Sequence, residues 1–251
     1  MVKSYRAIQQ WNRWLSHFLG GELLLAENKL LLNLTEHCYG KHTVLVGVPK
    51  QNSLLEKGQI PDRILVTPFV LHDKNIRYVE GDWNELPIST GSVDLVVLPH
   101  SLEYVDNPRQ VLAEACRIVK PEGSIVIFGF NPHSLWGLQG SWNKINSRDA
   151  YSGKGNFLST STVKQWLALA DFELLKQRSL LFRPPIDQPK IFQKLKFMEW
   201  IGDKCILPFG GVYALMAKAK VIPLTPIRLN WKQQLAGAKL TIPGPSIRNS
   251  E

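Results

Sequence analysis

Five short apolar runs, separated by helical or turn-forming stretches, constrain this chain more than any other feature. They are rich in Val, Ile and Leu and cover residues 43–48, 63–67, 76–79, 93–99 and 124–130. Continuous apolar strands are typical of burial on both faces, which occurs in mostly parallel sheets covered by helices. The pattern therefore predicts an α/β fold with a mostly parallel sheet and helices on both of its faces.

The clearest helix between these runs covers residues 107–119, where Asn107 suits the capping position and Pro108 the first turn. Later in the chain the pattern predicts a helix over 160–170, a strand over 172–180, a basic helix over 190–203 and a strand over 211–218. The last two strands have no long crossover helix between them, as parallel neighbours would need. We therefore expect the last strand to be antiparallel.

The first 40 residues predict two helices. Ile8, Trp11 and Leu15 recur at three- and four-residue steps, the period of one helical face. The glycine pair at 20–21 is expected to separate this helix from a second one over 22–37. This organisation divides the chain into N-terminal helices (1–40), a sheet domain (41–220) and a basic, proline-containing tail (221–251).

The charge of the chain is unevenly distributed. Thirty Lys and Arg against 21 Asp and Glu give a net charge of +9, and residues 204–250 contain seven basic residues and no acidic one. Such a segment attracts phosphates or an anionic membrane surface, which makes RNA or an anionic surface a candidate partner. Scattered lysines are equally typical of plain solvated charge, so both interpretations stay open.

Composition narrows the class of protein and its compartment. With 44% hydrophobic and 20% charged residues, the chain resembles ordinary globular proteins, and no apolar stretch approaches the length of about 18 residues that a transmembrane helix needs. The charged start lacks the apolar core of a secretion signal, so the expected compartment is the cytoplasm. Three Cys without a CxxC pair and six His without paired spacing indicate no metal site.

A long, ordered stretch carries a family resemblance. Residues 80–129 read EGDWNELPISTGSVDLVVLPHSLEYVDNPRQVLAEACRIVKPEGSIVIFG. They resemble the central part of the class I S-adenosylmethionine-dependent methyltransferases, and GFNPHSLWGL at 129–138 is similar to the YafS-like bacterial subgroup. The resemblance implies a Rossmann-like sheet of seven strands, with S-adenosyl-L-methionine lying across the carboxyl ends of the first four.

The resemblance also implies cofactor-binding residues. Asp82 matches the position that contacts the adenine amino group, and Trp83 would form an apolar lid on the ring. Asp94, which opens the fourth strand, is expected to be structural. The remaining cofactor-binding candidates follow the first, second and fourth strands and are Gly47, Val48, Thr67 and Pro99.

The first cofactor motif departs from the family pattern. Family members usually have an acid two residues before a Gly-x-Gly-x-Gly loop, whereas here Leu45 stands at the acid position and Gln51 at the third glycine. Glycine lets the backbone pass close to a ligand, and a Cβ obstructs this approach. The acid that usually ends the second strand and binds the ribose is also missing, and Thr67 offers only a hydroxyl there.

Polar residues after the fourth strand are the catalytic candidates: His100, Glu103 and Tyr104. Methyl transfer from a sulfonium depends largely on placement, and a base is needed only when the acceptor must lose a proton. An imidazole suits that task, although His100 and Glu103 are equally interpretable as capping or hinge residues. Asn131 and His133, past the fifth strand, are expected either to orient substrate or to fix their loop.

Two functional hypotheses remain. The first is an active methyltransferase with a divergent cofactor pocket, capped by the N-terminal helices, acting on a small-molecule acceptor. The second is a methyltransferase-fold binding module whose basic C-terminal segment engages RNA, another anionic partner or a membrane surface. The identity of the methyl acceptor and the oligomeric state are not encoded in any pattern that we recognise.

Overall fold

A computed structural model gives the structure of residues 2–56, 58–71, 75–138, 156–199 and 210–221. Seven strands form one sheet in the order β3-β2-β1-β4-β5-β7-β6. They are β1 (His42–Val46), β2 (Asp62–Thr67), β3 (Tyr78–Glu80), β4 (Val93–Pro99), β5 (Val119–Phe130), β6 (Phe172–Leu180) and β7 (Val212–Ala219). Neighbours from β3 to β5 are parallel, and β7 runs antiparallel to both β5 and β6. The predicted fold class is confirmed.

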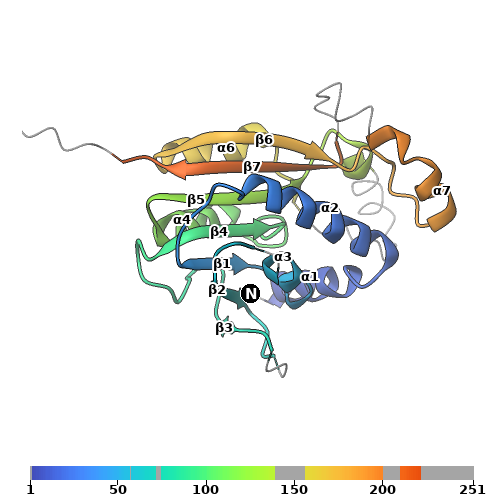
Figure 1. Cartoon of the computed structure of the whole chain (residues 1–251). Coiled ribbons are helices and arrows are strands. Elements are labelled where there is room, and N and C mark those ends of the chain that lie inside the picture. The colour runs from blue at the N-terminus through green and yellow to red at the C-terminus, as the bar shows by residue number, and fades with distance from the viewer. Residues whose placement is uncertain (1, 57, 72–74, 139–155, 200–209, 222–251) are drawn as a thin grey trace, which may run out of the picture. The chain divides into compact units, whose positions relative to one another are not determined.

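Helices lie on both faces of this sheet, with α2 on one face and α4 and α6 on the other (Figure 1). The helices are α1 (Val2–Trp14), α2 (Phe18–Leu34), η1 (Pro49–Asn52), α3 (Ser53–Glu56), α4 (Pro108–Ile118), α6 (Thr160–Leu169) and α7 (Pro189–Lys194). The helix predicted over 190–203 is thus shorter, because α7 ends at Lys194. Residues 200–203 of that prediction lie outside the described residues.

The sequence signals at α4 correspond closely to its structure. Pro108 is the first helical residue, and the side chain of Asn107 accepts a hydrogen bond from the backbone N–H of Gln110 at 3.3 Å. This contact satisfies one of the N–H groups that a helix start leaves unpaired. The inward stripe is buried and consists of Val111, Leu112, Ala115 and Ile118.

The break between the N-terminal helices lies earlier than predicted. The glycine pair at 20–21 is inside α2, and the chain turns at residues 15–17 instead. A Cβ built on Gly20 would lie 2.5 Å from both Cα of Leu15 and the carbonyl oxygen of Trp14, which is closer than real contacts allow. The glycine therefore permits the close approach of α2 to the end of α1, and it does not interrupt a helix.

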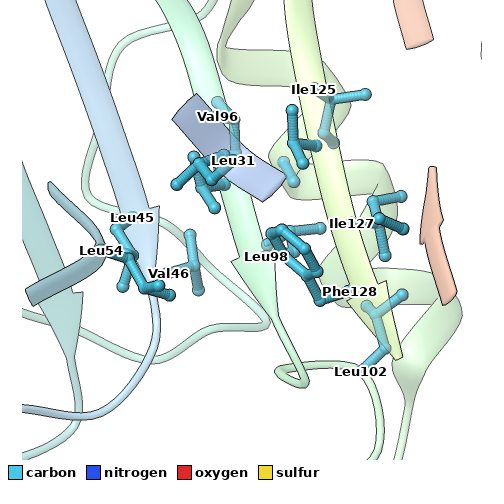
Figure 2. Packing of buried hydrophobic residues seen from close by; sticks show 14 of the residues in the cluster. Leu31, Leu45, Val46, Leu54, Val96, Leu98, Leu102, Ile125, Ile127 and Phe128 are labelled. Atoms are coloured by element: carbon cyan, nitrogen blue, oxygen red, sulfur yellow. The ribbon is translucent and has the colours of Figure 1, made fainter. Parts of the chain in front are cut away.

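The hydrophobic core follows the central strands. Figure 2 shows Leu45 and Val46 of β1, Val96 and Leu98 of β4, and Ile125 and Ile127 of β5 packed together with Leu31 of α2. Successive residues of a strand point to opposite faces, so burial of consecutive residues means that both faces of the sheet are covered. This burial explains the continuous apolar runs of the sequence.

Asp94 joins the starts of the central strands. One carboxylate oxygen accepts from the backbone N–H groups of Lys41 and His42, at 2.9 and 3.0 Å, and Lys120 of β5 donates to both oxygens at 3.0 Å. Partial burial raises the pKa of Asp94, but these hydrogen bonds outweigh it and hold the pKa below its ordinary value. This pairing supports the structural role expected of Asp94.

Candidate active site

The candidate site lies where four parallel strands end. β1, β2, β3 and β4 terminate on one edge of the sheet, at Val46, Thr67, Glu80 and Pro99. Open α/β sheets bind ligands outside this carboxyl edge. The predicted catalytic and cofactor-binding residues come directly after these strand ends.

His100 follows β4 in an unusual backbone conformation. Its φ is +58°, in the left-handed region that residues other than glycine adopt only when their surroundings hold them there. The N–H of His100 donates to the carbonyl oxygen of Phe128 on β5 at 3.0 Å. Its side chain is completely buried. The neighbouring strand therefore fixes the turn that carries this residue.

The ring of His100 lies between two buried carboxylates. Its Nδ1 is 3.0 Å from Oε2 of Glu103, and its Nε2 is 2.6 Å from Oε1 of Glu27 on α2. The other oxygen of Glu103 accepts a hydrogen bond from the backbone N–H of Phe130. We call Glu27, His100 and Glu103 the acid–histidine cluster. Glu27, which lies 73 residues before His100, was not predicted from the sequence.

The pKa values of His100 and Glu103 in the acid–histidine cluster are both raised, so these groups hold their protons to higher pH than usual. Burial alone lowers the pKa of His100, but the carboxylates of Glu103 and Glu27 outweigh burial and raise the pKa to about 9. Burial raises the pKa of Glu103 as well, against the opposing effect of His100. At neutral pH His100 is thus an imidazolium whose two nitrogens both face carboxylates. A role as general base would require one of these carboxylates to leave the ring.

This protonation makes stability depend on pH. Since folding raises the pKa of His100 from 6.5 to about 9, its contribution is fully present below pH 6.5 and is lost as the pH rises through 9. We expect the free energy of unfolding, measured with urea, to fall by about 3 kcal/mol across this range. His100→Gln should flatten the profile, whereas a matched change at the exposed His133 should not. An unchanged free energy between pH 6.5 and 9 would contradict a charged His100.

Aromatic rings cover the cluster. The ring centroid of Trp11, on α1, lies 5.1 Å from that of His100 and 5.0 Å from that of Tyr104, and the Phe130 ring is 4.3 Å from His100. Trp11 is 1% exposed. The predicted catalytic residues His100, Glu103 and Tyr104 are therefore brought together, beneath side chains of the two N-terminal helices.

The loop after β1 is filled by a side chain of the protein. Oε1 of Gln51 accepts from the N–H of Val48 at 3.0 Å, and its Nε2 donates to the carbonyl oxygen of Pro99 at 2.9 Å. A Cβ on Gly47 would lie 2.6 Å from the same Oε1, so glycine is needed there. From the sequence, Gln51 was noted only because it replaces the third glycine of the motif. Its side chain thus links the ends of β1 and β4 and occupies the N–H of Val48.

The cofactor-binding candidates after β2 and β3 differ in exposure. Thr67 is buried, and its hydroxyl has no hydrogen-bond partner among the described residues. Trp83 is also buried, and its Nε1 donates to the carbonyl oxygen of Val66 at 3.2 Å. Asp82 is exposed, and its Oδ1 accepts from the backbone and side-chain amides of Asn84 at 2.9 and 2.8 Å. Only Oδ1 of Asp82 is occupied by hydrogen bonds within the described part of the chain.

A groove of about 1200 Å³ opens beside Asp82. Its lining comes from α1, from the end of β2, from the segment after β3 and from the segment that leads into α4: Tyr5, Arg6, Ile8, Gln9, Pro68, Glu80, Gly81, Asp82, Trp83, Asn84, Glu85, Val105, Asp106, Asn107 and Gln110. We call it the Asp82 groove. Asp82 and Trp83 line this groove, whereas Gly47, Val48 and Thr67 are buried outside its lining.

Asn131 and His133 lie past β5 and do not line the groove. Asn131 is buried; its backbone N–H donates to the carbonyl oxygen of Gly211 at 2.9 Å and its side-chain amide to that of Gly210 at 3.2 Å. Its Oδ1 accepts from the N–H of His133 at 3.1 Å. These contacts are those of a loop-fixing residue, and a substrate role for either residue stays a prediction.

The described residues contain neither a candidate metal centre nor a candidate membrane span. No group of three His, Cys, Asp or Glu side chains there is arranged to hold a metal ion. Within the same residues, no helix has the length and apolarity that crossing a membrane would require.

Comparison with known proteins relates part of this sheet to methyltransferases. Residues 56–127 match a family described as a methyltransferase domain. Uncharacterized protein YafS of Escherichia coli (strain K12) is 33% identical over 97 residues, which cover 39% of this chain and 40% of that protein. A malonyl-[acyl-carrier protein] O-methyltransferase of Methylococcus capsulatus is 23% identical over 126 residues, covering 50% of this chain and 44% of the relative. The matches thus span less than half the length of these curated relatives.

A solved structure has a similar fold. A SAM-dependent methyltransferase from Thermotoga maritima is similar with a TM-score of 0.61 at 18% identity, covering 86% of this chain and 97% of that chain. The fold is that of the class I S-adenosylmethionine-dependent methyltransferases, and residues 56–127 resemble the methyltransferase domain of that family. S-adenosyl-L-methionine is the cofactor of this family.

The residues of this chain fit the two ends of S-adenosyl-L-methionine unequally. Asp82, which is predicted to contact adenine, lines an open groove and keeps one carboxylate oxygen free of hydrogen bonds within the described residues. At the strand ends next to the glycine loop, the amide of Gln51 takes the N–H of Val48, and Trp11 covers His100. The structure thus leaves open space beside Asp82, whereas the N–H of Val48 and the ring of His100 are already in contact with side chains of the protein.

Proposed function

We propose that this chain transfers a methyl group from S-adenosylmethionine to a small-molecule acceptor, with the adenosine portion held in the Asp82 groove. The observation that carries the proposal is the position of Asp82, which matches the adenine contact of the family and lines a groove large enough for a ligand. Four residues of α1 line the same groove. In this proposal the N-terminal helices therefore cap the cofactor site.

In this proposal, each group at the carboxyl edge of the sheet has a defined role. Asp82 accepts a hydrogen bond from the adenine amino group through Oδ2, and Trp83 and Pro68 provide apolar wall. When bound, the cofactor supplies a methyl group carried on a sulfonium. The acid–histidine cluster marks the end of β4, where the family places the methyl group and its acceptor. Placement of the two reactants, more than proton transfer, supplies the rate in such a site.

The proposal requires movement of the N-terminal helices. Trp11 of α1 and Glu27 of α2 both contact the His100 ring, so no acceptor reaches that ring while they are in place. Loop and lid motions of this kind commonly complete active sites after ligand binding. Ligand binding is therefore expected to displace α1 from the end of β4 and to withdraw the side chain of Glu27 from the His100 ring.

Changing Asp82 tests the proposed adenine contact. Asp82→Ala is expected to weaken S-adenosylmethionine binding by about 10- to 100-fold in calorimetric titrations, since a hydrogen bond to a charged group contributes about 1.5–3 kcal/mol. Asp82→Asn keeps an acceptor for the turn at Asn84 and removes only the charge. Glu85→Ala changes an exposed acid of the same groove and serves as the matched control. Equal affinity in the parent and both Asp82 variants would remove Asp82 from the site.

A second candidate function is a methyltransferase-fold binding module without cofactor chemistry. It is favoured by Gln51, which fills the space beside Gly47 and uses the N–H of Val48. In this case the basic segment 204–250 would engage RNA or an anionic surface; of that segment only residues 210–221 are described. Titration at millimolar S-adenosylmethionine without heat or a thermal shift would favour the binding module over methyl transfer.

A further inference from the structure

Glu80 is a carboxylate without a partner at the end of β3. It is the last residue of that strand, it is exposed, and it lines the Asp82 groove. Within the described part of the chain, neither of its carboxylate oxygens takes part in a hydrogen bond or an ion pair. Both oxygens of Glu80 are therefore available to a ligand in the groove.

The sheet fixes Glu80 beside the end of β2. Thr67, the last residue of β2, is its register partner, and the N–H of Gly81 donates to the carbonyl oxygen of Thr67 at 3.1 Å. Neighbouring strands lie about 4.8 Å apart, so β2 and β3 end side by side (Figure 1). β2 itself leads into Thr67 and Pro68, which supply no carboxylate, and the side chain of Thr67 is buried. At this point of the carboxyl edge, the acid comes from β3.

Glu80 and Asp82 face the same side of the chain. Successive residues of an extended strand point to opposite sides, so residues 80 and 82 share one side and Gly81 faces the other. A Cβ on Gly81 would lie 2.7 Å from Cδ of Pro87, so that other side is filled by the protein. Both carboxylates line the Asp82 groove, and two residues of extended chain separate them by about 6 to 7 Å.

This pair of acids matches the donors of a nucleoside. Adenosine has two sets of strong hydrogen-bond donors at opposite ends: the amino group of the base and the two neighbouring hydroxyls of the ribose. In the proposed function the amino group donates to Asp82, so the hydroxyls need a second acceptor in the groove. Carboxylates are the usual partners of ribose hydroxyls in nucleotide-binding α/β sheets. The two oxygens of Glu80 can accept from both hydroxyls at once.

Glu85 is the other exposed acid of the groove to consider. Its N–H donates to the carbonyl oxygen of Asp82 at 3.2 Å, which places it in a turn and not on a strand. From there the chain runs toward α4, where Glu114 accepts a hydrogen bond from the N–H of Leu86 at 3.0 Å. Glu80, held at the end of β2, is therefore the better candidate for the ribose.

We propose that Glu80 binds the two ribose hydroxyls of the adenosine portion and makes the groove specific for an unmodified ribose. The inference rests on the proposed function, which places the adenosine portion in the Asp82 groove. It assigns the two polar ends of the nucleoside to two acids of one segment, Glu80 and Asp82.

Adenosine and 2′,3′-dideoxyadenosine test the inference, because they differ only in the two hydroxyls and both lack the methionine portion. NMR titrations of the ¹⁵N-labelled protein give the two dissociation constants, and shifts of the Gly81 and Asn84 amide signals locate the ligand in the groove. The parent is expected to bind adenosine at least about tenfold more tightly, as hydrogen bonds to a charged group imply. Glu80→Ala should bring the two dissociation constants to near equality, without changing that of the dideoxy compound.

Two further variants make the comparison specific. Glu85→Ala removes an acid from the same groove and should keep the parent ratio of dissociation constants. Glu80→Gln keeps an acceptor oxygen without the charge, so its ratio should lie between those of the parent and Glu80→Ala. This second variant also decides if Glu80→Ala does not fold.

The possible failures are distinguishable. Equal affinity of the parent for both compounds, a parent ratio that persists in the Glu80 variants, or a ratio lost in Glu85→Ala instead would each overturn the role of Glu80. The proposed function would stand in these cases, because adenosine would still bind in the groove. If the parent binds neither compound, the groove does not hold adenosine, and the proposed function fails together with the inference that rests on it.

Discussion

Replacing His100 with alanine is expected to lower the free energy of unfolding by about 3 to 5 kcal/mol. The change removes the cation between Glu27 and Glu103 and leaves two carboxylates buried at 0% and 2% exposure. Breaking a buried ion pair from one side is costly because the remaining charge stays out of water without compensation. Urea unfolding at pH 6.5, followed by circular dichroism, measures the loss.

Two further variants separate this effect from others. His133→Ala changes an exposed histidine and should stay within about 0.5 kcal/mol of the parent. Adding Glu27→Gln to His100→Ala should recover part of the loss, because only one buried carboxylate then remains. If His100→Ala costs less than about 1 kcal/mol, the cluster is not a buried charged unit.

The expected instability affects how catalysis at His100 is judged. The sequence offered His100 either as a base for the acceptor or as a capping or hinge residue, and loss of general-base assistance typically lowers the rate by about 10² to 10⁴. In the structure both ring nitrogens face carboxylates, so a rate loss in His100→Ala would also follow from partial unfolding. Turnover must therefore be compared at a temperature at which the variant is still folded.

Local signals explain why so much of the sheet was predictable. The strands β1, β2 and β4 are continuous apolar runs, and the start of α4 is marked by Asn107 followed by Pro108. Each signal lies within one element, so a single sequence is sufficient to detect it. The prediction at Gly20 was wrong because a glycine can either interrupt a helix or let two helices approach closely. Here Gly20 allows the close approach.

The site was less predictable because its contacts are distant in sequence. Glu27 reaches His100 over 73 residues, and Gln51 reaches Pro99 over 48. One signal was present for Glu27, namely an acid at four-residue spacing within a leucine stripe. The motif did place Asp82 and Trp83 together at an open groove. It gave no indication that Gln51 would use the N–H of Val48.

Truncating Trp11 to alanine is expected to cost about 3 to 5 kcal/mol, the usual range for removing a buried tryptophan. Trp11 is 1% exposed, and its ring lies 5.1 Å from that of His100, 5.0 Å from that of Tyr104 and 5.9 Å from that of Phe130. Its loss leaves a cavity over the acid–histidine cluster and removes the ring contacts of α1 with His100 and Tyr104. Circular dichroism in urea measures the change without relying on tryptophan fluorescence.

Trp14→Ala is the matched control for this prediction. Trp14 lies on the same helix and stacks on Trp11 at 5.1 Å, but it is only partly buried. Its truncation should therefore cost clearly less, on the order of 1 kcal/mol. Equal losses in the two variants would mean that α1 is held by general packing along its length. A larger loss in Trp11→Ala would show that the contact of Trp11 contributes most where, in the proposed reaction, α1 must open.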